Sequence, residues 1–142
     1  MKTCLIMAMI LLLFAGASFT VFAGEKKKAP PPPQTHCPIS GHPVDGQFYA
    51  DVEGFRVLAA GPNEAEEIRR NPEKAFSALA KKRQAAVPVV WVCPNMRQQV
   101  SQAYPFVQQA GKRIYYCCAP CQPVIRKDFK KAANILRQLA GQ

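Results

Sequence analysis

Two stretches of the chain place β-favouring apolar residues on both sides of a glycine, a pattern typical of β-hairpins. The first surrounds Glu53-Gly54 and the second surrounds Gly111, and aromatic or β-branched residues flank the glycine in both. Such residues favour paired strands, and glycine favours the tight turn between them. The pattern therefore predicts four strands, over residues 48–52, 55–58, 106–108 and 113–116.

Helical patterns follow each hairpin. After the first, Asn63 is placed to cap one helix and Asn71-Pro72 to start another. After the second, a helix is expected to start within 118–121, and Asp128 is placed to cap the last helix. Apolar residues there recur at helical spacing and predict a buried stripe. Its members are Val124, Ile125, Phe129, Ala132, Ala133, Leu136 and Leu139.

The two hairpin–helix segments align with each other, which indicates an internal repeat. Cys37 falls on Cys93 and Val44 on Val100, each cysteine being followed by proline. Each unit has about 50 residues, too few to bury a good core alone. We therefore expect an α+β fold of two small hairpin-plus-helix units in tandem, packed on a joint core.

The ends of these units can be assigned from composition. Residues 1–23 combine one lysine, a long apolar run and small residues before position 24, which is the pattern of a secretory signal peptide. An uncleaved membrane anchor is the alternative. Residues 24–35 hold lysines and four consecutive prolines and predict an extended linker. The first unit then covers 36–86 and the second 87–142, in a protein expected in the periplasm or outside the cell.

The charge of the chain adds little about function. The formal net charge is +10, and lysine and arginine are spread over the helical segments. We expect a solvated basic surface with, at most, weak association with an anionic membrane surface. Nucleic acid is not an expected partner of an exported protein. No nucleophile elbow or phosphate loop is present in the sequence, so an enzyme is not expected.

The cysteines carry the candidate chemistry. Cys4 lies in the expected signal peptide, which leaves five, an odd number. Cys93 opens a Cys-Pro turn, whereas Cys117, Cys118 and Cys121 follow the second hairpin and begin a helix. Thiolates at those places assemble a sulfur-rich metal site in small folds. Adjacent cysteines seldom contact one ion, so we expect Cys93, Cys121 and either Cys117 or Cys118 as ligands.

The fourth ligand stays open between the other cysteine of the vicinal pair, Met96 and water. A thioether favours Cu(I), and four thiolates favour Zn(II). The first unit has no cysteine aligned with the cluster, so one transition-metal ion per chain is expected. A weaker candidate site remains there, formed by His36, Cys37 and His42.

The segments "VCPNM" and "GKRIYYCCAPC" resemble the TRASH/YHS-type metal-binding domains, treble-clef-like relatives of zinc ribbons in bacterial heavy-metal handling proteins. The resemblance covers roughly 89–135 and, more weakly, 36–76. It implies binding of copper, zinc or a similar soft ion in sensing, storage or transport, with a metal transporter or efflux component as a partner. Its ligands would be Cys93, Cys121 and Cys117 or Cys118. The gap after Cys93 is longer than is typical of the family.

Two other interpretations of the cysteines remain. A disulfide from Cys93 to the cluster would make the chain a disulfide-stabilised, non-catalytic interaction module whose basic helices form the contact surface. Cys118 and Cys121 also form a Cys-x-x-Cys pair. A thioredoxin-like enzyme needs more strands after that pair than the remaining residues can supply.

Overall fold

Two β-hairpins, each followed by two helices, make up the part of the chain that the structure describes, residues 33–142 of a computed structural model. This confirms the predicted α+β class. The expected signal peptide and most of the expected linker lie outside the described residues. In chain order the elements are β1 (Phe48–Val52), β2 (Phe55–Ala59), α1 (Pro62–Arg70), α2 (Pro72–Lys81), β3 (Val87–Pro88), β4 (Phe106–Gln109), β5 (Lys112–Tyr115), α3 (Cys121–Lys127) and α4 (Phe129–Leu139).

Both hairpins turn on two residues with positive φ. These are Glu53 and Gly54 (φ 51° and 80°) in the first hairpin and Ala110 and Gly111 (φ 50° and 72°) in the second. Two left-handed central residues produce the turn whose twist matches that of antiparallel strands. The predicted strands are confirmed, and no strand end differs from the prediction by more than one residue.

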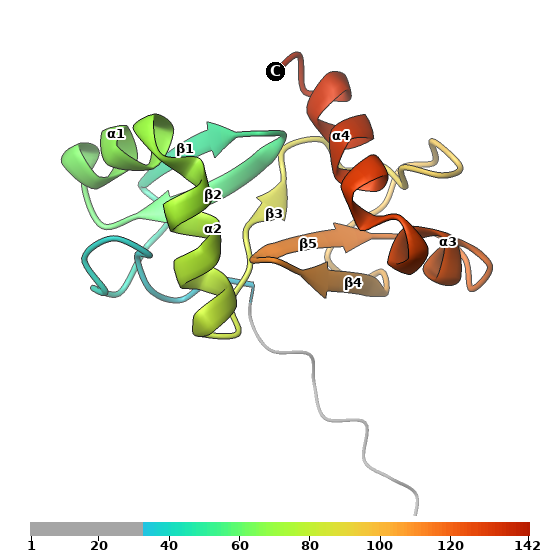
Figure 1. Ribbon diagram of the computed structural model, residues 1–142, viewed down its shortest axis with the longest axis horizontal. Coiled ribbons are helices and arrows are strands. Elements are labelled where there is room, and N and C mark those ends of the chain that lie inside the picture. Colours follow the sequence, from blue (N-terminus) through green and yellow to red (C-terminus); the bar gives the residue numbers. More distant parts are fainter. Residues whose placement is uncertain (1–32) are drawn as a thin grey trace, which may run out of the picture. The chain divides into compact units, whose positions relative to one another are not determined.

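The segment around β3 joins the two hairpins. β3 pairs antiparallel with β2 and completes the sheet β1-β2-β3, while β4 and β5 form a second sheet. One residue earlier, the Ala86 N–H donates to the Gly111 carbonyl (2.9 Å), and the Ala86 carbonyl accepts from the Arg113 N–H (3.0 Å). Figure 1 shows β3 between the two hairpins. The predicted boundary between residues 86 and 87 falls in this connection, and the division into two units stays a prediction.

The second helix of each pair begins at a capping side chain. Asn71 accepts a hydrogen bond from the Lys74 N–H (3.3 Å), and Asp128 accepts one from the Lys131 N–H (3.0 Å). Both predicted caps are confirmed. The cap predicted at Asn63 is wrong, because the cap position is two residues earlier, at Gly61, and has no side-chain hydrogen bond. Pro62 has the fixed φ that suits the first helical position, so the helix begins at this residue.

One hydrophobic core spans both hairpins and their helices. Much of the predicted C-terminal stripe belongs to it, but Val124 and Leu139 are 52% and 41% exposed. α3 ends at Lys127 and α4 begins at Phe129, so one helical period does not run through the whole stripe. The larger core side chains are Phe55, Val57, Ile68, Phe76, Leu79, Ile114, Tyr115, Ile125, Phe129 and Leu136.

Each hairpin turn packs against the last helix of the other half. A Cβ placed on Gly54 would lie 2.6 Å from the Arg137 backbone in α4, and one placed on Gly111 would overlap the Phe76 carbonyl oxygen in α2. Next to these glycines, Lys112 and Glu53 form an ion pair (2.5 Å) between the turns. The halves are thus held together at both turns. Within residues 33–142, no helix combines the length and apolar character needed to cross a membrane.

Candidate metal centre

The loop that opens with Cys93 is closed by backbone hydrogen bonds. The Cys93 N–H donates to the Gln98 carbonyl (2.8 Å), and the Arg97 N–H donates to the Cys93 carbonyl (2.8 Å). Arg97 has positive φ (59°), which turns the loop back. These bonds hold Cys93 in place with its side chain fully buried (0% exposed).

The loop at Cys37 is closed by the same bonds at equivalent positions. The Cys37 N–H donates to the His42 carbonyl (2.8 Å), and the Gly41 N–H donates to the Cys37 carbonyl (3.0 Å). Gly41 has positive φ, as Arg97 has in the other loop. The two Cys-Pro loops therefore share one local structure, although the tandem repeat as a whole stays a prediction.

The other two cysteines of the centre come from the segment between β5 and α3. Cys117 lies two residues beyond the end of β5, and Cys121 is the first residue of α3. The Cys121 N–H donates to the Cys118 carbonyl (3.0 Å), which closes a tight turn before the helix. This turn directs the end of the hairpin and the start of the helix toward the Cys93 loop.

Three thiols converge at this point. The Sγ atoms of Cys93, Cys117 and Cys121 all lie within 4.8 Å of one another. Cys93 and Cys121 are buried, and Cys117 is partly exposed. Two thiolates that bind one zinc ion at the usual Zn–S length are about 3.8 Å apart. The three sulfurs could therefore hold one ion after small side-chain adjustments.

Cys118 lies beside this trio rather than in it. Its Sγ is 3.1 Å from that of Cys121 and 3.8 Å from that of Cys117, and its side chain is partly exposed. Of the alternatives for the third ligand, the structure thus brings Cys117, not Cys118, into the converging group.

The thiols of the vicinal pair differ in acidity. Loss of solvation, together with hydrogen bonds and charge from Cys93 and Cys118, raises the pKa of Cys117 to about 12. A hydrogen bond from Cys121 lowers the pKa of Cys118, against the effect of desolvation. Without an ion, the cluster therefore keeps the proton on Cys117. Metal ligation requires the thiolate, so binding an ion would displace that proton.

Asn95 is a site residue that the sequence analysis missed. Its side-chain amide donates a hydrogen bond to the Cys121 Sγ (3.4 Å) from the loop that follows Cys93. Such outer contacts orient a ligand and stabilise its charge. The only available signal was its position two residues after Cys93, which is not specific.

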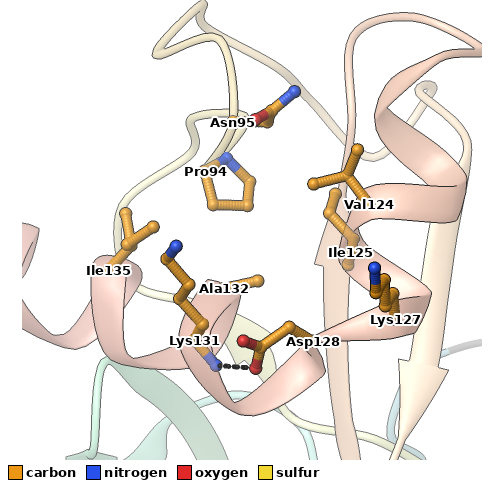
Figure 2. A pocket seen from close by; sticks show the side chains of 9 residues that line it. All are labelled: Pro94, Asn95, Val124, Ile125, Lys127, Asp128, Lys131, Ala132 and Ile135. Carbon is orange, nitrogen blue, oxygen red and sulfur yellow. Dashed lines mark hydrogen bonds between the residues drawn. The ribbon is translucent and has the colours of Figure 1, made fainter.

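A groove of about 470 Å³ adjoins this contact. Figure 2 shows it between Pro94 and Asn95 on one side and residues of α3 and α4 on the other. The exposed Val124 lies in this groove, together with Ile125, Lys127, Asp128, Lys131, Ala132 and Ile135. Asn95 thus belongs both to the groove wall and to the surroundings of Cys121.

The weaker candidates of the first unit do not converge. Within residues 33–142, Cys93, Cys117 and Cys121 form the one group of three or more cysteine, histidine or acidic side chains with such close donor atoms. His36 and His42 are exposed, and the His36 Nδ1 lies 2.9 Å from the Thr35 hydroxyl. In the second unit, Met96, the candidate thioether ligand, is 54% exposed in the Cys93 loop.

The buried Cys37 is surrounded by hydrogen-bond donors instead. Burial raises its pKa, but hydrogen bonds from the Ser40 side chain and from the Ser40, Ala60 and Ile39 backbone outweigh this effect. The pKa of Cys37 is therefore below its ordinary value. The thiol is held by its own loop and by the chain just after β2.

The five cysteines among the described residues are free, with no disulfide between them. No family model matches the chain, and no curated protein and no solved structure matches it either. The resemblance to TRASH/YHS-type domains therefore stays a prediction, and the geometry of the cysteine cluster is the evidence for function.

Proposed function

We propose that this chain binds one soft transition-metal ion, Zn(II) or Cu(I), through Cys93, Cys117 and Cys121. The observation that supports this most strongly is the convergence of their three Sγ atoms within 4.8 Å. Each sulfur comes from a different local structure: a loop, the segment after a strand, and the start of a helix. Thiolate sulfur is the donor type that selects copper(I) and zinc.

The role that we propose for this ion is metal handling or sensing. Three protein ligands leave a coordination position for water or for a ligand from a partner, whereas a purely structural zinc site is closed by four. Cys117 is partly exposed, so an incoming ligand can reach this side of the cluster. This arrangement suits an ion that is exchanged, and a metal transporter or efflux component is the partner we propose.

Export is part of the same proposal. It depends on the signal-peptide pattern of residues 1–23, which lie outside the described residues. A periplasmic or extracellular location would place the cluster where metal ions enter or leave a bacterial cell. We also propose weak association of the basic helices with an anionic membrane surface.

The alternative, a disulfide-stabilised interaction module, requires bonds that the described cysteines do not form in the structure. Counting thiols separates the two functions. A metal site releases three or four reactive thiols when the ion is chelated, whereas a protein with two disulfides among the five cysteines leaves one thiol free throughout.

The direct test is titration of the reduced full chain with Zn(II) and with Cu(I) under anaerobic conditions. We expect one equivalent to bind, and Cys93→Ser and Cys121→Ser to abolish stoichiometric binding. Cys37→Ser is the matched control, because Cys37 occupies the equivalent loop of the first unit outside the trio. Equal binding by wild type and Cys93→Ser would overturn the proposal.

A further inference from the structure

Cys118 and Cys121 form a second pair within the cluster. Their Sγ atoms are in contact at 3.1 Å, closer than the Sγ atoms of Cys118 and Cys117 (3.8 Å). The turn between them is already closed by the hydrogen bond from the Cys121 N–H to the Cys118 carbonyl (3.0 Å). The backbone thus holds the two thiols face to face.

A disulfide between them needs little rearrangement. The S–S bond is about 2.05 Å long, so the sulfurs must approach by about 1 Å, which side-chain rotation can supply. The neighbouring pair Cys117 and Cys118 is less suited, because adjacent residues would have to close a strained ring. Cys93 is fully buried and lies across the cluster on a separate loop.

The two thiols also differ in access. Cys118 is partly exposed, whereas Cys121 is 1% exposed at the start of α3. An external disulfide can therefore reach Cys118 first, and Cys121 is in position to resolve the mixed disulfide. Thiol–disulfide exchange depends on such access as well as on the thiolate.

We propose that Cys118 and Cys121 form a reversible disulfide that removes Cys121 from the metal site, so that oxidation by a small-molecule or protein disulfide switches metal binding off. This inference rests on the proposed function, because it adds regulation to the same trio. It gives the partly exposed Cys118, which lies outside the trio, a role of its own.

The exchange balances with one external disulfide as the oxidant. The Cys118 thiolate attacks one sulfur of that disulfide, forming a mixed disulfide and releasing the first thiolate of the oxidant. The Cys121 thiolate then attacks the Cys118 sulfur and releases the second. The two protons lost by Cys118 and Cys121 go to the released thiolates, so two protein thiols are oxidised and one disulfide is reduced to two thiols.

Metal binding and oxidation then compete for Cys121. A Cys121 thiolate engaged with an ion cannot resolve the mixed disulfide, and an oxidised Cys121 cannot act as a ligand. By linkage, each state disfavours the other to the same extent. The metal-loaded protein should resist oxidation, and the oxidised protein should fail to bind metal until it is reduced.

The test uses the full chain in four forms: wild type, Cys118→Ser, Cys37→Ser and Cys93→Ser. Each is reduced, freed of metal, treated with oxidised glutathione and then titrated with Zn(II), before and after dithiothreitol. Trypsin cleavage places Cys117, Cys118 and Cys121 on residues 114–126 and Cys93 on residues 84–97. A bond within the cluster is therefore distinguished from one to Cys93 by mass spectrometry, and fragmentation assigns it within 114–126.

We expect wild type and Cys37→Ser to lose about 2 Da within 114–126, to fall from one bound ion to none, and to recover with dithiothreitol. Cys118→Ser should bind one ion before and after oxidant. A stable glutathione adduct on Cys118, or full binding by protein with the mapped Cys118–Cys121 bond, overturns the inference while the proposed function stands. Failure of reduced wild type to bind any ion, or equal binding by reduced Cys93→Ser, overturns the proposed function instead.

Discussion

Gly111→Ala should destabilise the protein more than its backbone conformation alone requires. Gly111 has φ 72°, and an added Cβ would overlap the Phe76 carbonyl oxygen of α2. The matched control is Gly46→Ala, because Gly46 has φ 85° and open space where its Cβ would lie. The difference between the two variants isolates the contact between the second hairpin and the helix of the first half.

The expected magnitudes follow from two costs. A non-glycine residue in the left-handed region costs about 1–2 kcal/mol, and both variants pay this. Overpacking against a fixed backbone adds about 1–3 kcal/mol for Gly111→Ala alone. We therefore expect the unfolding free energy to fall by about 1–2 kcal/mol for Gly46→Ala and about 2–5 kcal/mol for Gly111→Ala. The latter corresponds to a drop in melting temperature on the order of 10–20 °C for a unit of this size.

Urea unfolding of the reduced, metal-free protein, followed by circular dichroism, measures both variants under the same conditions. Gly54→Ala should resemble Gly111→Ala, since its Cβ would lie 2.6 Å from the Arg137 backbone. If Gly111→Ala and Gly46→Ala agreed within about 0.5 kcal/mol, the reciprocal packing of turns and helices would not be a stabilising contact.

Two further predictions concern the Cys-Pro loops. The pKa of Cys37 is lowered from 9.0, so the folded protein binds fewer protons than the unfolded chain as the pH rises toward 9. Over that window the metal-free wild type should therefore gain stability relative to Cys37→Ser. The gain should be lost as the pH falls through the folded pKa of Cys37. A constant difference between their urea midpoints across the window would contradict this. Asn95→Ala removes the hydrogen bond to the Cys121 Sγ and should weaken Zn(II) binding by about tenfold, measured by chelator competition, with an unchanged stoichiometry. Unchanged affinity would show that this contact does not support the site.

The features that the sequence predicted well are local. The turn glycines, the caps at Asn71 and Asp128 and the strands beside the turns depend on neighbours within a few residues. Asn63 failed as a cap because Pro62 competes for the same helix start. The predicted buried stripe was wrong at Val124, which lines the groove beside Asn95, and at Leu139, which is the last residue of α4.

The long-range contacts could not be predicted from such local patterns. The packing of Gly54 on α4 and of Gly111 on α2 joins residues with no shared local pattern. Similarly, the spacing of the cysteines limited the third metal ligand to Cys117 or Cys118 but could not distinguish between them. That choice depends on where the chain turns after β5, and the hydrogen bond of Asn95 depends on the same docking of loop and helix.

The most direct test of the proposed metal centre is native mass spectrometry, with elemental analysis, of the full chain purified without chelator. One copper or zinc ion per chain is the predicted result, present in Cys37→Ser and absent from Cys93→Ser and Cys121→Ser. A fully reduced wild-type protein that carries no ion and takes up none from an excess of either metal would contradict it.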